Sequence, residues 1–154
     1  RQFNWEGARD LSGFEHVFIG EQQKKKLVGH HFWYKYWLDD QDKKDRVDLT
    51  CDVFSDQSSA SPHVITISYH LKATDYHKKE TVEITKKRCT YLVGISAEGL
   101  LALGTVKALG KERVPNYFYI NDIPFKFECI MSPDGKSIRT FYLSNHSPGH
   151  GLNI

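Results

Sequence analysis

From residue 63 to residue 143 the chain consists mainly of short segments rich in β-branched and aromatic residues, separated by polar turns. Such segments are typical of strands with one buried face. The predicted strands are His63–Ala73, Glu80–Thr85, Tyr117–Ile120, Ile123–Met131 and Ser137–Leu143. Turns are predicted at Thr74–Lys79 and at Ser132-Pro133-Asp134-Gly135. Because strands joined by short turns pair in opposite directions, we expect antiparallel sheets rather than a doubly wound parallel sheet.

Helical patterns lie before and within this strand-rich region. Aromatic residues recur at helical spacings within Leu27–Asp39, which predicts an amphipathic helix there. A short strand is predicted at Val47–Val53 and a loop at Gln57–Pro62. Ser96 is a suitable N-cap for a second helix that Gly110 would close. The predicted fold class is therefore α+β, with a helical N-terminal part followed by antiparallel β-sheets.

Length and cysteine content bound the organisation of the chain. With 154 residues it can bury a core without covalent staples, so we expect one domain over residues 1–154, or a tightly coupled pair of subdomains, with peripheral ends at 1–12 and 145–154. Cys51, Cys89 and Cys129 are odd in number and lack C-x-x-C spacing. This pattern favours free thiols over a disulfide framework or a zinc knuckle.

Charge and hydropathy limit which kinds of partner, membrane or nucleic acid, the chain is expected to bind. No run of 18 apolar residues is present, so we expect no membrane partner. The sequence starts with arginine, and we expect a secreted protein or an excised piece of a larger one. A net charge of +2 is too small for a general nucleic-acid binder. Four short basic clusters, at residues 24–26, 43–44, 78–79 and 86–88, are nevertheless compatible with a surface that holds phosphates.

A pair of histidines is the first candidate for chemistry. His16 lies in Gly13-Phe14-Glu15-His16-Val17-Phe18-Ile19-Gly20-Glu21, and His31 follows fifteen residues later in Gly29-His30-His31-Phe32-Trp33. An extended chain would hold them roughly 50 Å apart, so they cooperate only if the chain turns back, which Gly20 and Gly29 permit. Two imidazoles across a phosphodiester could remove a proton from a 2′-hydroxyl and protonate the leaving 5′-oxygen.

This double motif resembles the signature of the EndoU family of endoribonucleases. The family places its second histidine two residues after a glycine, which selects His31 over His30. The family also has a catalytic lysine eight residues before a glycine, with a serine or threonine four residues after the lysine. Lys86, Thr90 and Gly94 match that spacing, and Lys87 remains the alternative. A fixed ammonium group would offset charge that develops on the phosphate oxygens.

A third motif, Ile138-Arg139-Thr140-Phe141-Tyr142, resembles the closing Thr-x-Tyr of EndoU enzymes. The resemblance runs from about Gly13 to Tyr142, and the chain length is similar to that of short bacterial EndoU domains, including toxin domains. It implies that Tyr142 lies against the nucleoside and that Thr90 helps to select uracil, with Thr140 in support. Pockets that stack a base and hydrogen-bond its edge are a common way of reading single-stranded RNA.

The resemblance implies a uridylate-specific endoribonuclease whose substrate is single-stranded RNA. His31 would be the general base, His16 the general acid and Lys86 the stabilising cation, and the product would carry a 2′,3′-cyclic phosphate. DNA should be untouched because it lacks the 2′-hydroxyl. Manganese stimulates many members, so Mn²⁺ is a candidate cofactor, although metal-independent activity is equally compatible with the sequence. Glu15 and Glu21 match acidic family positions and are expected to orient His16 or contact a metal.

Two other functions are also compatible with the sequence. One is an RNA-binding module of EndoU ancestry without activity, which the joint presence of His16, His31 and Lys86 disfavours. The other is a histidine-based metal or scaffold module, which would need further ligands near the pair. If the chain is a bacterial toxin domain, an immunity protein is an expected partner.

Overall fold

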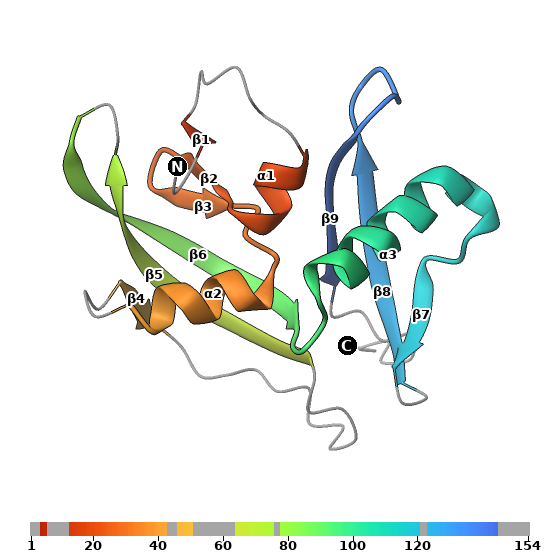
Figure 1. Ribbon diagram of the computed structural model, residues 1–154, viewed down its shortest axis with the longest axis horizontal. Coiled ribbons are helices and arrows are strands. Elements are labelled where there is room, and N and C mark those ends of the chain that lie inside the picture. The colour runs from red at the N-terminus through yellow and green to blue at the C-terminus, as the bar shows by residue number, and fades with distance from the viewer. Residues whose placement is uncertain are drawn as a thin grey trace, which may run out of the picture.

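The computed structural model describes residues 4–5, 13–42, 46–50, 64–75, 78–120 and 123–144. Two β-sheets lie side by side, with helices packed against each, and the chain passes from the first sheet to the second through helix α3 (Figure 1). The described residues confirm the predicted α+β class. None of their helices is both long and apolar enough to cross a membrane.

The first sheet has six strands in the order β1-β2-β3-β6-β5-β4. Their bounds are β1 Asn4–Trp5, β2 Glu21–Gln23, β3 Lys26–Val28, β4 Val47–Leu49, β5 Val64–Asp75 and β6 Glu80–Leu92. The long β5–β6 hairpin is antiparallel and forms the centre of this sheet. The short β1–β2 and β3–β6 pairs are parallel, so the first sheet is mixed.

The second sheet has three antiparallel strands, β7 Tyr117–Ile120, β8 Ile123–Met131 and β9 Ile138–Ser144. Helix α3, Ala97–Gly110, precedes it and continues into the 3₁₀ turn η1, Lys111–Arg113. The Ser96 hydroxyl accepts a hydrogen bond from the Gly99 amide at 3.0 Å, which confirms the predicted N-cap. The β8–β9 turn is also confirmed, with Gly135 in the left-handed region at φ +69°.

Two short helices belong to the N-terminal half, α1 Gly13–Phe18 and α2 Trp33–Asp40. The prediction of one helix over Leu27–Asp39 was wrong at its start, because Leu27 lies in β3 and α2 begins only at Trp33. Gly29 and His30 cause the difference. Both have positive φ, +68° and +60°, and the chain cannot be helical through left-handed residues.

The strand predictions were right in position and incomplete in length. Strand β6 continues seven residues beyond the predicted Thr85 to Leu92. Strand β4 covers Val47–Leu49, and the rest of the predicted strand from Cys51 onward lies outside the described residues. The predicted loop Gln57–Pro62 also lies outside them. Strands β7 and β8 have the predicted bounds.

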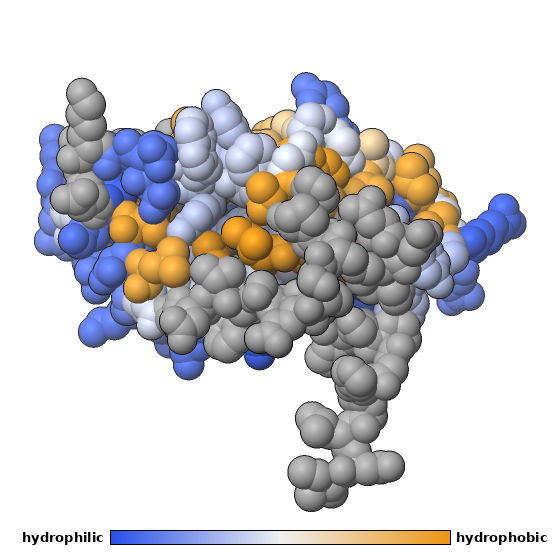
Figure 2. Space-filling model, turned by 90° about the horizontal axis from the view of Figure 1, so that it is seen from below, coloured by the Kyte–Doolittle hydropathy of each residue, from blue (hydrophilic) through white to orange (hydrophobic). Residues whose placement is uncertain are grey.

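Each sheet has its own cluster of buried residues. The first includes Leu71, Ile84 and Tyr91 from the β5–β6 hairpin. The second joins α1, α3 and the three-stranded sheet, with Val17 and Phe141 fully buried. Seen from below, the surface shows separate apolar areas among hydrophilic side chains (Figure 2). Scattered exposed apolar residues of this kind are ordinary on soluble domains.

The contact between α3 and β9 is tight at Gly104. A Cβ atom added there would lie 2.7 Å from the Phe141 ring, although alanine is normally favoured over glycine in a helix. We expect Gly104→Ala to destabilise the protein by about 1–3 kcal/mol through overpacking. The measurement is the urea unfolding midpoint. Thr105→Ala at the neighbouring exposed position is the control, and equal midpoints for both variants would contradict this account of the packing.

Candidate active site

Helix α1 carries His16 and is fixed against β9. A Cβ atom on Gly13 would lie 2.0 Å from the carbonyl oxygen of Ile138, so only glycine permits this approach. The helix ends at Phe18, and the Glu15 carbonyl accepts hydrogen bonds from the amides of Ile19 and Gly20. This closure positions the next strand so that a carboxylate from β2 can reach the histidine.

Glu21, at the start of β2, is that carboxylate. Its Oε1 lies 3.3 Å from His16 Nδ1. The side chains are 17% and 14% exposed, so the pair is partly shielded from water. A carboxylate at Nδ1 fixes the orientation of the imidazole ring. Of the two acidic positions noted in the sequence, Glu15 is the chain neighbour of His16, and the fold brings the Glu21 carboxylate to the His16 ring.

His31 reaches His16 because the segment Gly29–His31 is hydrogen-bonded to α1. The His30 amide donates to the His16 carbonyl at 2.9 Å, and the His31 amide donates to the Val17 carbonyl at 2.6 Å. A Cβ atom on Gly29 would lie 2.0 Å from the same His16 oxygen. The predicted return of the chain is therefore present, and the two ring centroids are 6.3 Å apart.

Strand β9 brings Tyr142 to the same place. Its ring stacks on His31 with centroids 5.0 Å apart and an interplanar angle of 21°. Thr140, two residues earlier, projects from the same face of the strand. Its hydroxyl oxygen is buried and has no hydrogen-bond partner among the described residues. A buried hydroxyl without a partner is costly unless a ligand satisfies it.

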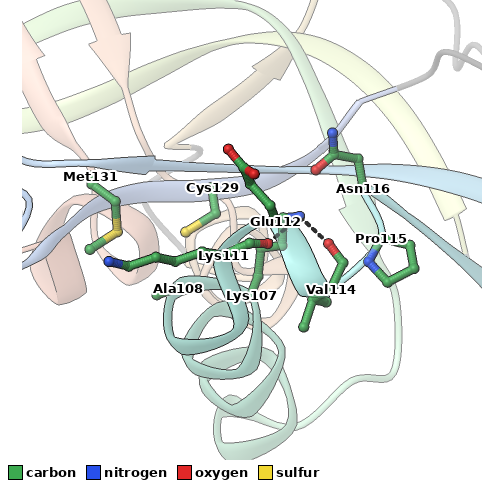
Figure 3. Close-up of a pocket in the computed structure, with 9 residues that line it drawn as sticks. All are labelled: Lys107, Ala108, Lys111, Glu112, Val114, Pro115, Asn116, Cys129 and Met131. Atoms are coloured by element: carbon green, nitrogen blue, oxygen red, sulfur yellow. Dashed lines mark hydrogen bonds between the residues drawn. The ribbon is translucent and has the colours of Figure 1, made fainter.

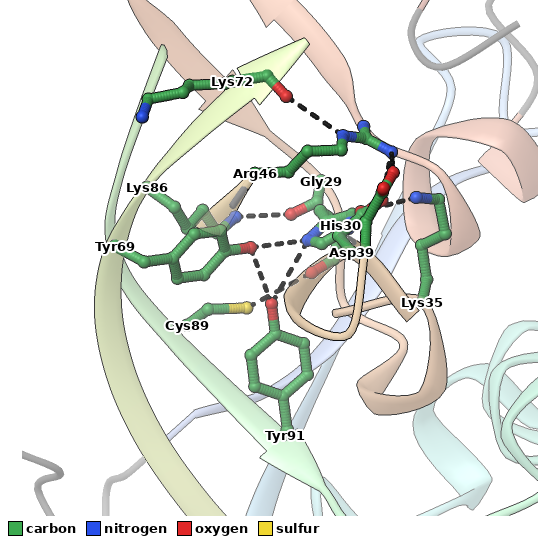
Figure 4. Close-up of polar contacts among 11 residues, drawn as sticks. Gly29, His30, Lys35, Asp39, Arg46, Tyr69, Lys72, Lys86, Cys89 and Tyr91 are labelled. Carbon is green, nitrogen blue, oxygen red and sulfur yellow. Dashed lines mark hydrogen bonds and ion pairs between the residues drawn. The ribbon is translucent and has the colours of Figure 1, made fainter. Parts of the chain in front are cut away.

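Lys86 is buried against the segment Gly29–His31. Its ammonium group donates to the Gly29 carbonyl, and the residue is 7% exposed (Figure 4). Lys87, the alternative lysine, is exposed. The structure therefore brings Lys86, and not Lys87, to the segment that carries His31.

A β-bulge separates Lys86 from Thr90. Tyr69 pairs with Lys86 while Ile67 pairs with Cys89, so β6 holds one extra residue between the two pairs. Lys86 and Cys89 consequently share a face, and Thr90 projects from the other one. There the Thr90 hydroxyl lies 2.9 Å from the Thr66 hydroxyl.

Burial sets the electrostatics of the site. Desolvation lowers the pKa of His31 well below its usual 6.5, and the charges of Lys86 and His16 act in the same direction. Near pH 7 His31 is therefore neutral, which is the state required of a base. The two histidines are thus in different surroundings. His16 lies beside a carboxylate, whereas His31 is partly buried and close to the charge of Lys86.

Sequence reasoning missed the buried polar network under this segment. His30 is fully buried, and its Nδ1 lies 2.5 Å from the Tyr69 hydroxyl and 3.3 Å from that of Tyr91 (Figure 4). Its Nε2 lies 3.4 Å from Asp39 Oδ2. Arg46 completes the network at 2.9 Å from Asp39 Oδ1. No sequence signal marks these partners, because they come from distant elements.

In the ranges that the structure describes, no three His, Cys, Asp or Glu side chains could hold a common metal ion. A cavity of about 440 Å³ lies between the end of α3 and β8 (Figure 3). Lys107, Lys111, Cys129 and Met131 are among its lining residues, and none of the residues predicted for catalysis is.

Known proteins resemble this chain over most of its length. The sequence model of the family described as endoribonuclease XendoU matches residues 1–143. A uridylate-specific endoribonuclease C from Danio rerio is 27% identical over 139 residues, 88% of this chain and 41% of that protein. A poly(U)-specific endoribonuclease from Xenopus tropicalis is 27% identical over 146 residues, 90% of this chain and 46% of that protein. The chain spans less than half the length of these relatives.

A solved structure shares the fold. It is the structure of XendoU, described as a splicing independent snoRNA processing endoribonuclease. The TM-score is 0.57 at 24% sequence identity, and the match covers 89% of this chain and 48% of that one. This likeness supports the α+β architecture described above.

The lowered pKa of His31 predicts how stability varies with pH. Between the folded-state pKa and 6.5 the unfolded chain binds more protons than the folded one, so stability is full above pH 6.5 and falls as the pH decreases. Burial lowers the pKa of His30 in the same way. Each group contributes a slope of up to about 1.4 kcal/mol per pH unit. We expect the urea midpoint to decrease from pH 7.5 to pH 5.5.

The decrease should be smaller in His31→Asn, which has no imidazole to protonate. His70→Asn is the control, because its side chain is 34% exposed on β5 and should keep the wild-type dependence. Identical pH dependence in wild type and His31→Asn would contradict the assignment of a lowered pKa to His31.

Proposed function

The chain belongs to the endoribonuclease XendoU family, and from this membership we propose that it cleaves single-stranded RNA on the 3′ side of uridines. The observation that carries the proposal is the facing pair of histidines, His16 and His31, with ring centroids 6.3 Å apart. That gap is suited to a phosphodiester contacted from both sides. The curated relatives are named for uridylate-specific or poly(U)-specific endoribonuclease activity, which supports the same substrate class.

The proposed reaction is a transphosphorylation within the RNA. Neutral His31 takes the proton of the 2′-hydroxyl, and the 2′-oxygen attacks the adjacent phosphorus. His16, held by Glu21, donates a proton to the 5′-oxygen as the P–O5′ bond breaks. The products are a 2′,3′-cyclic phosphate and a 5′-hydroxyl end. DNA has no 2′-hydroxyl to attack with, so it would remain intact.

Lys86 is proposed to stabilise the charge that develops on the phosphate oxygens. Its ammonium group donates a hydrogen bond to the Gly29 carbonyl, and its charge lowers the pKa of His31. Both observations support a role for this charge close to the His31 ring. Preorganised charge in a partly dehydrated site is more effective than the same charge in water. The Gly29 carbonyl fixes the position of this charge before substrate binds.

Uracil recognition is proposed for Tyr142 and Thr140. Thr90, the other residue that the family resemblance suggested for this role, projects from the face of β6 opposite Lys86, where its hydroxyl lies beside that of Thr66. Tyr142 offers a ring beside His31, and the buried Thr140 hydroxyl lacks a partner among the described residues. A hydroxyl that donates or accepts can read the edge of a pyrimidine. The alternative function, an inactive RNA-binding module, would need no neutral base beside an oriented acid, and this pairing favours the enzyme.

Cleavage assays with matched oligonucleotides test the proposal. Two single-stranded RNAs, one with a single uridine and one with none, are incubated with chelator or with Mn²⁺. We expect cleavage only after uridine, and a 10²- to 10⁴-fold loss of rate, roughly, in His16→Ala and His31→Ala. His70→Ala is the matched control and should cleave like wild type. Absence of cleavage by wild type under both conditions would favour the binding module.

Substitution of each lysine in turn tests whether Lys86 or Lys87 has the catalytic role. Lys86→Met keeps most of the length of the side chain and removes its charge, so kcat should fall by about 10²- to 10³-fold. Lys87→Met should retain nearly all activity, because that side chain is exposed. Single-turnover cleavage of the uridine RNA measures both. The opposite result, loss in Lys87→Met alone, would assign the catalytic role to Lys87.

A further inference from the structure

Cys89 contacts His31, the histidine proposed as general base, at its Nδ1 atom. Its Sγ lies 3.5 Å from His31 Nδ1 and 3.5 Å from the carbonyl oxygen of His30. Both are within reach of a sulfur hydrogen bond. The thiol is buried, with the residue 2% exposed, and burial raises its pKa, so the group is a protonated thiol. It therefore has one hydrogen to donate and lone pairs to accept.

One assignment of hydrogens satisfies all three groups. The thiol donates to the His30 carbonyl, and the sulfur accepts from the N–H of His31 at Nδ1. The reverse assignment, with the thiol donating to a bare Nδ1, leaves the His30 carbonyl without the thiol as donor. Buried carbonyl groups are rarely left without donors, so the first assignment is favoured.

The rest of the surroundings hold the ring in this orientation. The bulge in β6 turns Lys86 and Cys89 to one face, so one strand contacts Gly29, His30 and His31 in succession. Tyr142 covers a face of the His31 ring. With Nδ1 occupied by sulfur, Nε2 is the nitrogen that remains for a substrate.

We propose that Cys89 is a positioning residue that holds His31 in the Nδ1–H tautomer, which leaves Nε2 unprotonated as the general base. The catalytic consequence rests on the proposed function, whereas the tautomer itself does not. When His31 takes up a proton at Nε2, the Nδ1–H bond to sulfur persists and stabilises the imidazolium ring. The thiol neither gains nor loses a proton in the reaction.

Nitrogen NMR of the whole chain tests the tautomer directly. Two-bond ¹H–¹⁵N correlations at pH 7.5 identify which ring nitrogen of His31 carries hydrogen, and the His31→Asn spectrum assigns the signals. We expect a protonated Nδ1 and an unprotonated Nε2 in wild type. A His31 ring with its hydrogen on Nε2 would overturn the proposal, whether or not the protein cleaves RNA.

Variants of Cys89 test whether its contact with His31 affects the tautomer and the rate of cleavage. Cys89→Ala removes the acceptor, and we expect His31 to populate both tautomers and kcat to fall about two- to tenfold, with KM unchanged. Cys89→Ser supplies a hydroxyl that can donate and accept as sulfur does, and it should restore the Nδ1–H tautomer and most of kcat. Cys129→Ala, the same change at a half-buried thiol of β8, should resemble wild type in both measurements.

Each outcome decides one claim. A wild-type tautomer in Cys89→Ala, with unchanged kcat, overturns the role of Cys89. A tautomer shift in Cys89→Ala in a protein that never cleaves RNA supports the positioning role while contradicting the proposed function. The Cys89→Ser variant and the wild-type spectrum keep the test decisive if Cys89→Ala does not fold.

Discussion

The hydrogen bonds between the Gly29–His31 segment and α1 are the contacts on which the site depends. The amides of His30 and His31 donate to carbonyls of His16 and Val17, in the last turn of α1. The carbonyls at the end of a helix have no partners inside it, so they are available to an incoming strand of backbone. This pairing converts a separation of fifteen residues along the chain into facing imidazoles. It also requires two consecutive residues of positive φ, one of which is not glycine.

The non-glycine residue, His30, explains the buried polar network. A left-handed conformation at a residue with a side chain costs about 1 kcal/mol or more and persists only where the surroundings fix it. The His30 ring is fixed by Tyr69 and Tyr91 on one side and by Asp39 on the other. Burial alone would raise the pKa of Asp39, but its hydrogen bonds from His30 and Lys35 lower it, so it stays ionised beside a neutral His30.

Sequence reasoning succeeded where local pattern decides structure. Strands β7 and β8 and the Ser96 cap follow from alternation, turn residues and capping chemistry. It failed where distant contacts override local preference. The helical periodicity of Leu27–Asp39 is real only from Trp33, because backbone pairing with α1 holds Gly29 and His30 outside a helix. The bulge that turns Lys86 away from Thr90 is likewise invisible in their spacing, since it is defined by pairing with β5.

The two sheets both contribute contacts to one imidazole, that of His31. Strand β6 of the first sheet contacts the His31 segment through Lys86 and Cys89, while Tyr142 of the second sheet stacks on the His31 ring. The second sheet is held by α1 through Gly13 and by α3 through Gly104, both at distances that exclude a Cβ atom. A change in the placement of either sheet therefore alters the stacking or the hydrogen bonding of the same ring. His16, His31 and Tyr142 come from α1, the loop before α2 and β9. This site can therefore form only when the N-terminal half and the three-stranded sheet fold against each other.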